Sequence, residues 1–97
     1  MSLFVMIGWD AADGAERRGR WRQQHVNHIR MLERKGRVRY AGPLKDEDGE
    51  RSIGALIVVE AADLHEARNV VNTDPYVAGG VFETITIHPF KRVVPEP

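Results

Sequence analysis

Residues 3–9 have the sequence LFVMIGW, an unbroken apolar run rich in aromatic and β-branched side chains. Such a run is typical of a β-strand that is covered on both faces. Residues 53–59, IGALIVV, have the same character and predict a second strand of this kind. Residues 38–44 and 81–87 mix apolar with polar side chains and predict two strands at the edges of a sheet. The sequence therefore predicts two central and two edge strands.

A long helix is expected over residues 13–35. Asp13 and Glu16 have the spacing of a capping box, in which the Asp side chain accepts an amide hydrogen and the Glu side chain reaches back to the cap. Gly36 follows a basic pair. This is favourable at a helix C-terminus, because cations suit the negative end of the dipole and glycine accepts a left-handed conformation.

A shorter helix is expected after the second apolar strand. Asp63 and Glu66 repeat the capping-box spacing and predict where this helix begins. Its end is predicted at Asp74 and Pro75, because the residue before a proline is disfavoured in the helical conformation.

Proline and glycine predict the ends of the edge strands. The strand at residues 38–44 is expected to break at Pro43, and the last strand is expected to close at Pro89. Residues 45–51 are acidic and contain Gly49, which predicts a hairpin loop.

These elements follow the order β-α-β-β-α-β in one domain that spans residues 1–97. An antiparallel sheet of order 4-1-3-2 places the two apolar strands at the centre, which predicts an α+β, ferredoxin-like fold. Right-handed crossovers put both helices on one face of the sheet. Because the opposite apolar face also needs a cover, the sequence predicts a homodimer in which a second copy supplies it.

The composition limits the possible functions. The chain has 97 residues, of which 42% are hydrophobic, and this is enough for one modest core. Lys plus Arg and Asp plus Glu each number 14, which disfavours nucleic acid as a partner. The absence of cysteine excludes disulfides, thiolate nucleophiles and Cys-based metal sites. The apolar run at 3–9 is too short for a signal segment or a membrane span, so a cytoplasmic protein without membrane contact is expected.

The first helix carries a histidine in an unusual place. At about 100° per residue, His25 falls in the middle of an apolar stripe with Trp21 and Ile29, and Arg18 and Arg22 flank it. A titratable ring in such a stripe is costly unless a partner satisfies it or a function uses it. A core histidine bonded to the backbone is one interpretation. The two arginines favour another, a site for a carboxylate substrate.

The predicted topology brings dispersed residues to one rim of the sheet. Asp74 would orient the ring of His25, since a catalytic base needs an orienting partner. Gly42 and Pro43 would shape the wall of the site, and Tyr76 would contact the substrate. An alternative for Asp74 is a turn residue before proline, without any catalytic role.

Several landmarks occur in order along the chain: Arg22-Gln23-Gln24-His25, Gly36, Ala41-Gly42-Pro43-Leu44, Thr73–Val81 and His88–Lys91. Together they resemble the YciI (YCII-related) family of small dimeric α+β-barrel proteins over nearly the whole chain. The resemblance implies a homodimer of ferredoxin-like units and a catalytic dyad formed by His25 and Asp74. Wider relatives isomerise lactones or eliminate chloride from muconate-type compounds, so any reaction is implied by analogy alone.

Two other kinds of site compete with this interpretation. RNA-recognition domains share the element order, but residues 53–59 carry aliphatic side chains where base-stacking aromatics are needed. His25 and His28 have a spacing that could hold a metal, yet no acidic residue joins them in sequence. No metal and no cofactor are therefore expected.

The sequence thus predicts a dimeric, enzyme-like domain that acts on a small, anionic organic substrate. His25 would transfer a proton and Asp74 would fix its tautomer, in a reaction of the lyase, isomerase or hydrolase type. Arg22, together with Arg18, would bind the anionic group. The alternative is a non-catalytic small-molecule-binding or accessory dimer, which has the same fold and differs only in whether the site turns a substrate over.

Overall fold

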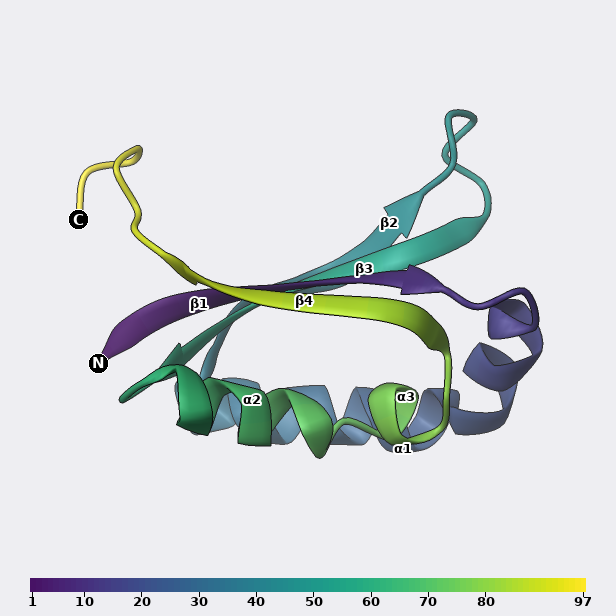
Figure 1. The fold of residues 1–97 in the computed structure, drawn as a ribbon, viewed down its shortest axis with the longest axis horizontal. Helices are drawn as coiled ribbons and strands as arrows, with labels where there is room; N and C mark the ends of the chain where they lie inside the picture. Colours follow the sequence, from purple (N-terminus) through teal and green to yellow (C-terminus); the bar gives the residue numbers. More distant parts are fainter.

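Four antiparallel strands form one sheet, and all the helices lie on one face of it (Figure 1). The structure is a computed structural model that describes all 97 residues. Along the chain the elements are β1 (Ser2–Asp10), α1 (Gly14–Arg34), β2 (Val38–Lys45), β3 (Ser52–Ala61), α2 (Leu64–Asn72), α3 (Pro75–Ala78) and β4 (Phe82–Phe90).

The strand order in the sheet is β2-β3-β1-β4, which is the predicted order 4-1-3-2 counted from the other edge. Strand β1 pairs with β3 on one side and with β4 on the other, and every pairing is antiparallel. The two apolar segments therefore occupy the centre of the sheet and the mixed segments its edges. The predicted α+β, ferredoxin-like fold is confirmed.

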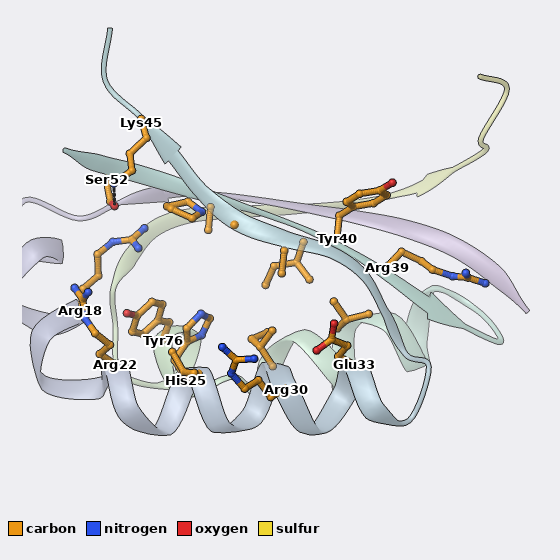
Figure 2. Close-up of a pocket in the computed structure, with 18 residues that line it drawn as sticks. Arg18, Arg22, His25, Arg30, Glu33, Arg39, Tyr40, Lys45, Ser52 and Tyr76 are labelled. Carbon is orange, nitrogen blue, oxygen red and sulfur yellow. Dashed lines mark hydrogen bonds between the residues drawn. The ribbon is translucent and has the colours of Figure 1, made fainter. Parts of the chain in front are cut away.

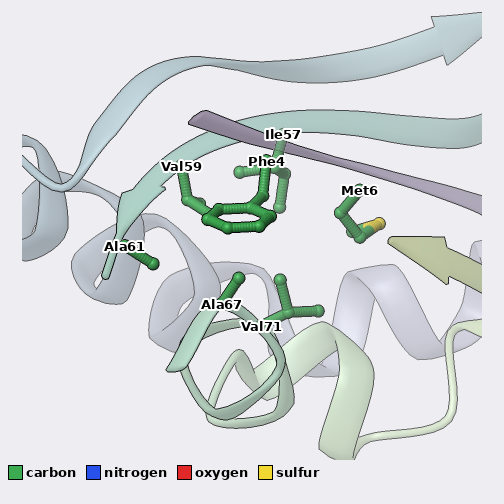
Figure 3. Packing of buried hydrophobic residues seen from close by; sticks show 7 residues of the cluster. All are labelled: Phe4, Met6, Ile57, Val59, Ala61, Ala67 and Val71. Carbon is green, nitrogen blue, oxygen red and sulfur yellow. The ribbon is translucent and has the colours of Figure 1, made fainter. Parts of the chain in front are cut away.

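The hydrophobic core lies between the two central strands and the helices (Figure 3). Seven buried residues from β1, β3 and α2 form it: Phe4, Met6, Ile57, Val59, Ala61, Ala67 and Val71. Because side chains alternate between the two faces of a strand, Val5 and Ile7 of β1 lie on the other face of the sheet. No helix of this chain covers that face (Figure 1).

The two ends of α1 differ in how well the sequence predicted them. Gly36 adopts a φ of 72°, as the predicted left-handed cap requires. At the N-terminus, Asp13 makes no side-chain cap hydrogen bond, so the predicted capping box is wrong. The Asp13 carboxylate instead accepts a hydrogen bond from Arg17 Nε at 2.7 Å. A charge-assisted bond to a side chain one turn away thus replaces the cap.

At the second predicted capping box the Asp63 cap is confirmed, whereas the Glu66 side chain reaches the amide before the cap residue and not that of Asp63. Asp63 Oδ1 accepts a hydrogen bond from the Glu66 amide at 2.8 Å, and Glu66 Oε2 accepts one from the amide of Ala62 at 3.3 Å. Helix α2 ends at Asn72, as Pro75 predicted, but the chain then forms the additional short helix α3. No helix here has the length and apolar character that crossing a membrane requires.

The prolines do not end the edge strands, and both predictions that they would are wrong. Strand β2 continues through Pro43 to Lys45, and β4 continues through Pro89 to Phe90. An edge strand has one unpaired side, so a proline whose missing N–H would face that side costs no ladder hydrogen bond.

Candidate active site

A groove of about 480 Å³ lies between α1 and the part of the sheet that β2 and β3 form (Figure 2). We call it the α1 groove. Its apolar lining includes Val26 and Ile29 from α1 and Ala55 and Ile57 from β3. His25 lies in the wall of the groove. A cavity of this volume, which combines apolar side chains with several charged ones, suits a small organic ligand that carries polar groups.

His25 and Asp74, the two residues predicted as a dyad, are in contact. His25 Nδ1 lies 2.8 Å from Asp74 Oδ1. The Asp74 side chain is only 2% exposed, whereas that of His25 is 20% exposed. Asp74 is also the N-cap of α3, where Oδ1 accepts a hydrogen bond from the Tyr76 amide at 2.8 Å. Asp74 therefore has the local role of the alternative interpretation, as the cap before Pro75, and the same carboxylate oxygen also contacts His25.

These hydrogen bonds determine which ring nitrogen of His25 carries the proton. The carboxylate Oδ1 is an acceptor, so Nδ1 must donate to it. In the neutral ring the other nitrogen, Nε2, then has a free lone pair. Because the side chain is partly exposed and lines the α1 groove, this lone pair is available to a ligand as a proton acceptor.

Tyr76 packs against one face of the His25 ring. The two rings stack with centroids 3.8 Å apart and planes 2° from parallel. Tyr76 is itself only 5% exposed and lines the groove. A ring held by a stack and a hydrogen bond has little rotational freedom, so α3 fixes both the tautomer and the orientation of His25.

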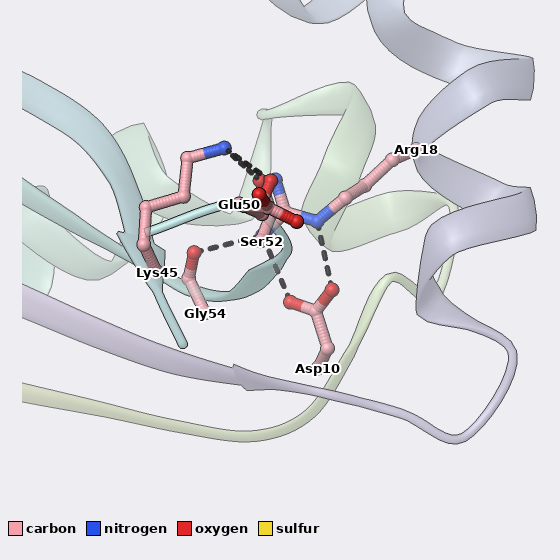
Figure 4. A network of polar contacts seen from close by, with 6 residues as sticks. All are labelled: Asp10, Arg18, Lys45, Glu50, Ser52 and Gly54. Atoms are coloured by element: carbon pink, nitrogen blue, oxygen red, sulfur yellow. Dashed lines mark hydrogen bonds and ion pairs between the residues drawn. The ribbon is translucent and has the colours of Figure 1, made fainter. Parts of the chain in front are cut away.

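Arg18 has its guanidinium engaged by neighbouring protein groups (Figure 4). Its Nε and one terminal nitrogen donate to the two carboxylate oxygens of Asp10 at 2.8 Å each, and that nitrogen also donates to the Gly54 carbonyl. Hydrogen bonding to Asp10 raises the pKa of Arg18, while burial acts against this. Arg18 lines the groove, but the structure gives it a structural partner that the sequence did not suggest.

The other predicted binding residues also lie in the lining of the α1 groove. Arg22 is exposed at its rim and forms no ion pair, and Gly42 and Pro43 belong to its β2 wall. Sequence reasoning missed Arg30 and Lys45, which line it too. Arg30 could not be found from the helical wheel alone, because it lies about 140° from His25.

The remaining histidines take no part in this site. His28 Nε2 contacts Thr73 Oγ1 at 3.3 Å, and His65 contacts Asn69. His88 is exposed on β4. No three His, Cys, Asp or Glu side chains cluster in a way that could hold a metal ion.

The fold and the site together define a class of protein, a small ferredoxin-like α+β domain in which a histidine and a buried aspartate meet beside a groove. Residues 2–91 match the YCII-related domain, and the chain belongs to the YCII-related family. It is 33% identical to Protein YciI of Escherichia coli over 94% of this chain and 98% of that protein. It is 28% identical to an uncharacterized protein of Haemophilus influenzae, over 93% of this chain and 97% of that protein. The resemblance inferred from the sequence is confirmed.

Solved structures with the same fold include an enzyme. The 5-chloro-2-hydroxyhydroquinone dehydrochlorinase of Burkholderia phenoliruptrix, solved with 2,5-dihydroxybenzoquinone, has a TM-score of 0.79 and 21% identity, covering 93% of this chain and 94% of that chain. An uncharacterized NIPSNAP domain protein of Burkholderia xenovorans has a TM-score of 0.53 and 11% identity, covering 100% and 99%. At these identities the likeness is one of fold.

Proposed function

We propose that this protein is a small homodimeric enzyme that transfers a proton to and from an anionic organic substrate. The observation that carries the proposal is the contact of His25 Nδ1 with the buried carboxylate of Asp74 at 2.8 Å. This contact leaves Nε2 as a base at the wall of the α1 groove. General bases in enzymes need this combination of a free lone pair, a fixed ring and access to a substrate.

The proposed step is a simple proton transfer. His25 Nε2 takes a proton from a carbon or oxygen of the substrate, and the electron pair of that bond stays on the substrate. The ring becomes an imidazolium, whose charge Asp74 stabilises through Nδ1. In an isomerisation the proton returns to another atom, and in an elimination the electron pair expels a leaving group. The dehydrochlorinase that shares this fold is named for an elimination of this kind.

The substrate is proposed to be anionic because the groove has free positive charge. Arg22 lines it one turn before His25 and has no carboxylate partner. A guanidinium without a partner, beside an apolar surface, is a suitable ligand for a carboxylate or an enolate. With Arg18 engaged by Asp10, Arg22 is the stronger candidate of the two arginines.

We propose that a second copy of the chain covers the free face of the sheet. The central strands place Val5, Ile7 and Leu56 on this face, and none of them is charged. Towards its border Trp9 is 49% exposed. Strand β4 adds polar side chains to this face, such as Thr86 beside Ile7, so its apolar part lies on the central strands. An apolar patch at the centre of a sheet is costly to leave in water and can pack against a copy of itself. The α1 groove lies on the opposite side of the sheet, so such a dimer leaves its mouth open.

A screen for turnover tests the proposed function. Small carboxylated enols, lactones and halogenated unsaturated acids would be incubated with the purified protein and with its His25→Ala variant, and the products analysed by NMR. Turnover that requires His25 supports the proposal. Tight binding of a compound without turnover, equal in both proteins, would instead indicate a non-catalytic binding domain.

A further inference from the structure

Two arginines of the α1 groove have no ion-pair partner, in contrast to their neighbours. Arg18 pairs with Asp10 at 2.8 Å and Arg39 pairs with Glu60 at 3.0 Å. Arg22 and Arg30 also line the groove, but neither forms an ion pair (Figure 2). The groove therefore has two arginines whose charge the protein itself does not neutralise. Lys45 also lines it without an ion pair, but its Nζ donates to Ser52 Oγ at 3.2 Å.

These two arginines lie on either side of His25 along the helix axis. Eight residues at a rise of about 1.5 Å each separate Arg22 from Arg30 by about 12 Å. On a helical wheel they lie at about +60° and about +140° from His25, about 80° apart, and both side chains line the groove. Val26 and Ile29, between them, give the groove an apolar wall. The lining is thus cationic at two places and apolar between them.

A carboxylate beyond Arg30 limits how far a bound ligand can extend along the groove. Glu33 lines the groove one turn beyond Arg30 and forms no ion pair. An acidic group that extended past Arg30 would meet this like charge, which is unfavourable. The groove therefore favours a ligand whose second acidic group stops at Arg30.

We infer that the substrate of the α1 groove is a two-ended dianion, with one acidic group on Arg22, the other on Arg30 and an apolar segment between them. The binding of the two acidic groups does not depend on the proposed function. Only the position of the atom that reacts with His25 rests on it. His25 lies about 4.5 Å along the axis from Arg22 and about 7.5 Å from Arg30. The atom that gives up its proton is therefore the one nearer to the acidic group on Arg22, whose guanidinium stabilises the charge that develops there.

Binding of simple diacids tests the inference without any need for turnover. The probes are succinate, adipate and suberate, with hexanoate as a monoanion of the same chain length as adipate. Dissociation constants are measured by titrating ¹⁵N-labelled protein in NMR experiments at constant ionic strength. We expect adipate to bind about fivefold more tightly than hexanoate, which is the upper range for one exposed ion pair. We also expect adipate to bind more tightly than the shorter and the longer diacid.

Three substitutions, each of which removes one charge, distinguish the contribution of Arg22 to binding from that of Arg30. Arg30→Gln should remove the preference for adipate and leave hexanoate unchanged, whereas Arg22→Gln should weaken both. Glu33→Gln should strengthen suberate relative to adipate, because it removes the like charge beyond Arg30. Arg34→Gln is the matched control, since Arg34 is exposed on the same helix and does not line the groove.

Two results would overturn the inference. One is equal affinity for adipate and hexanoate in the unmodified protein. The other is the same loss of adipate binding in Arg34→Gln as in Arg30→Gln, since the effect would then come from net charge. The titration is repeated on His25→Ala, where the diacid preference should persist. A protein that prefers the diacid but shows no His25-dependent turnover would therefore disprove the proposed function and support this inference.

Discussion

The imidazole of His25 in α1 and the carboxylate of Asp74 at the start of α3 meet at 2.8 Å, although 49 residues separate them in the chain. The contact depends on the short helix between α2 and β4. Asp74 caps this helix by accepting the Tyr76 amide, and Tyr76 stacks on the histidine ring. A single turn of chain thus supplies the hydrogen-bond acceptor and the stacking partner that hold one side chain.

The dyad predicts a clear difference between two substitutions. On a substrate found by the screen, His25→Ala should lower kcat/KM roughly 10²- to 10⁴-fold, the usual range for loss of an acid-base group. Asp74→Asn should lower it less, because the ring keeps Nε2 and the stack on Tyr76.

His28→Ala is the control for the dyad. It removes a second histidine of α1 that contacts Thr73 outside the groove. Each variant must keep the circular dichroism spectrum and oligomeric state of the unmodified protein, so that a loss reports chemistry. Full activity of a correctly folded His25→Ala variant would return His25 to the role of a core histidine.

The stack of Tyr76 on His25 predicts a second difference. Tyr76→Leu should lower kcat/KM about tenfold, because an aromatic pair contributes about 0.5–1.5 kcal/mol beyond its buried area. Tyr76→Phe keeps the stacked ring and should retain most of the activity. Steady-state kinetics of the two variants distinguishes the ring from the hydroxyl. An equal loss in both variants would show that the hydroxyl, which both lack, and not the stack, is what matters.

Local patterns in the sequence were sufficient for the strands and for most helix ends. Apolar runs and mixed segments report burial directly, which is why β1 and β3 were correctly placed at the centre. His25 and Asp74 were brought together only by combining the helical wheel with the topology. Both proline errors arose because a strand in an edge position tolerates a residue that would break a central one.

Long-range charge pairing was beyond the reach of these patterns. Asp10 follows the apolar run of β1, and nothing in the sequence distinguishes it as the partner of Arg18 across the turn. The pairing depends on where β1 ends relative to α1, which is a property of the packed fold. Arg30 was missed for a similar reason, because it lies about 140° from His25 on the helical wheel and only the structure shows that it lines the groove.

The pair formed by Asp10 and Arg18 predicts an effect on stability. The two side chains are only 10% and 7% exposed. Arg18→Gln leaves the Asp10 carboxylate buried without its cation, which should cost about 3 kcal/mol of unfolding free energy. The double variant Asp10→Asn with Arg18→Met should recover part of this loss, because no buried charge remains. Urea denaturation of the two variants measures the loss and its recovery. An Arg18→Gln variant of unchanged stability would instead favour the predicted role of Arg18 in substrate binding.

The sheet surface predicts that nucleic acid does not bind specifically. Val5 and Leu56 lie near the middle of the free face, where an RNA-binding sheet needs aromatic rings for base stacking. The equal numbers of acidic and basic residues also give no general attraction to phosphate. Fluorescence anisotropy with labelled single-stranded RNA at physiological salt should show no saturable binding. A sub-micromolar complex that resists added salt would contradict this prediction.

The free face of the sheet predicts an obligate homodimer that one charge can disrupt. Leu56 lies at the centre of this face, where β3 pairs it with Ile7 of β1 on one side and Gly42 of β2 on the other. A glutamate there would be buried without a partner against a second copy, at a cost of several kcal/mol. Sedimentation velocity at micromolar concentration should show a dimer for the unmodified protein and a monomer or an unfolded chain for Leu56→Glu. Gln24→Glu adds the same charge at an exposed position of α1 and should remain dimeric. A folded monomer of the unmodified chain, or an intact dimer of Leu56→Glu, would show that this face is not the interface.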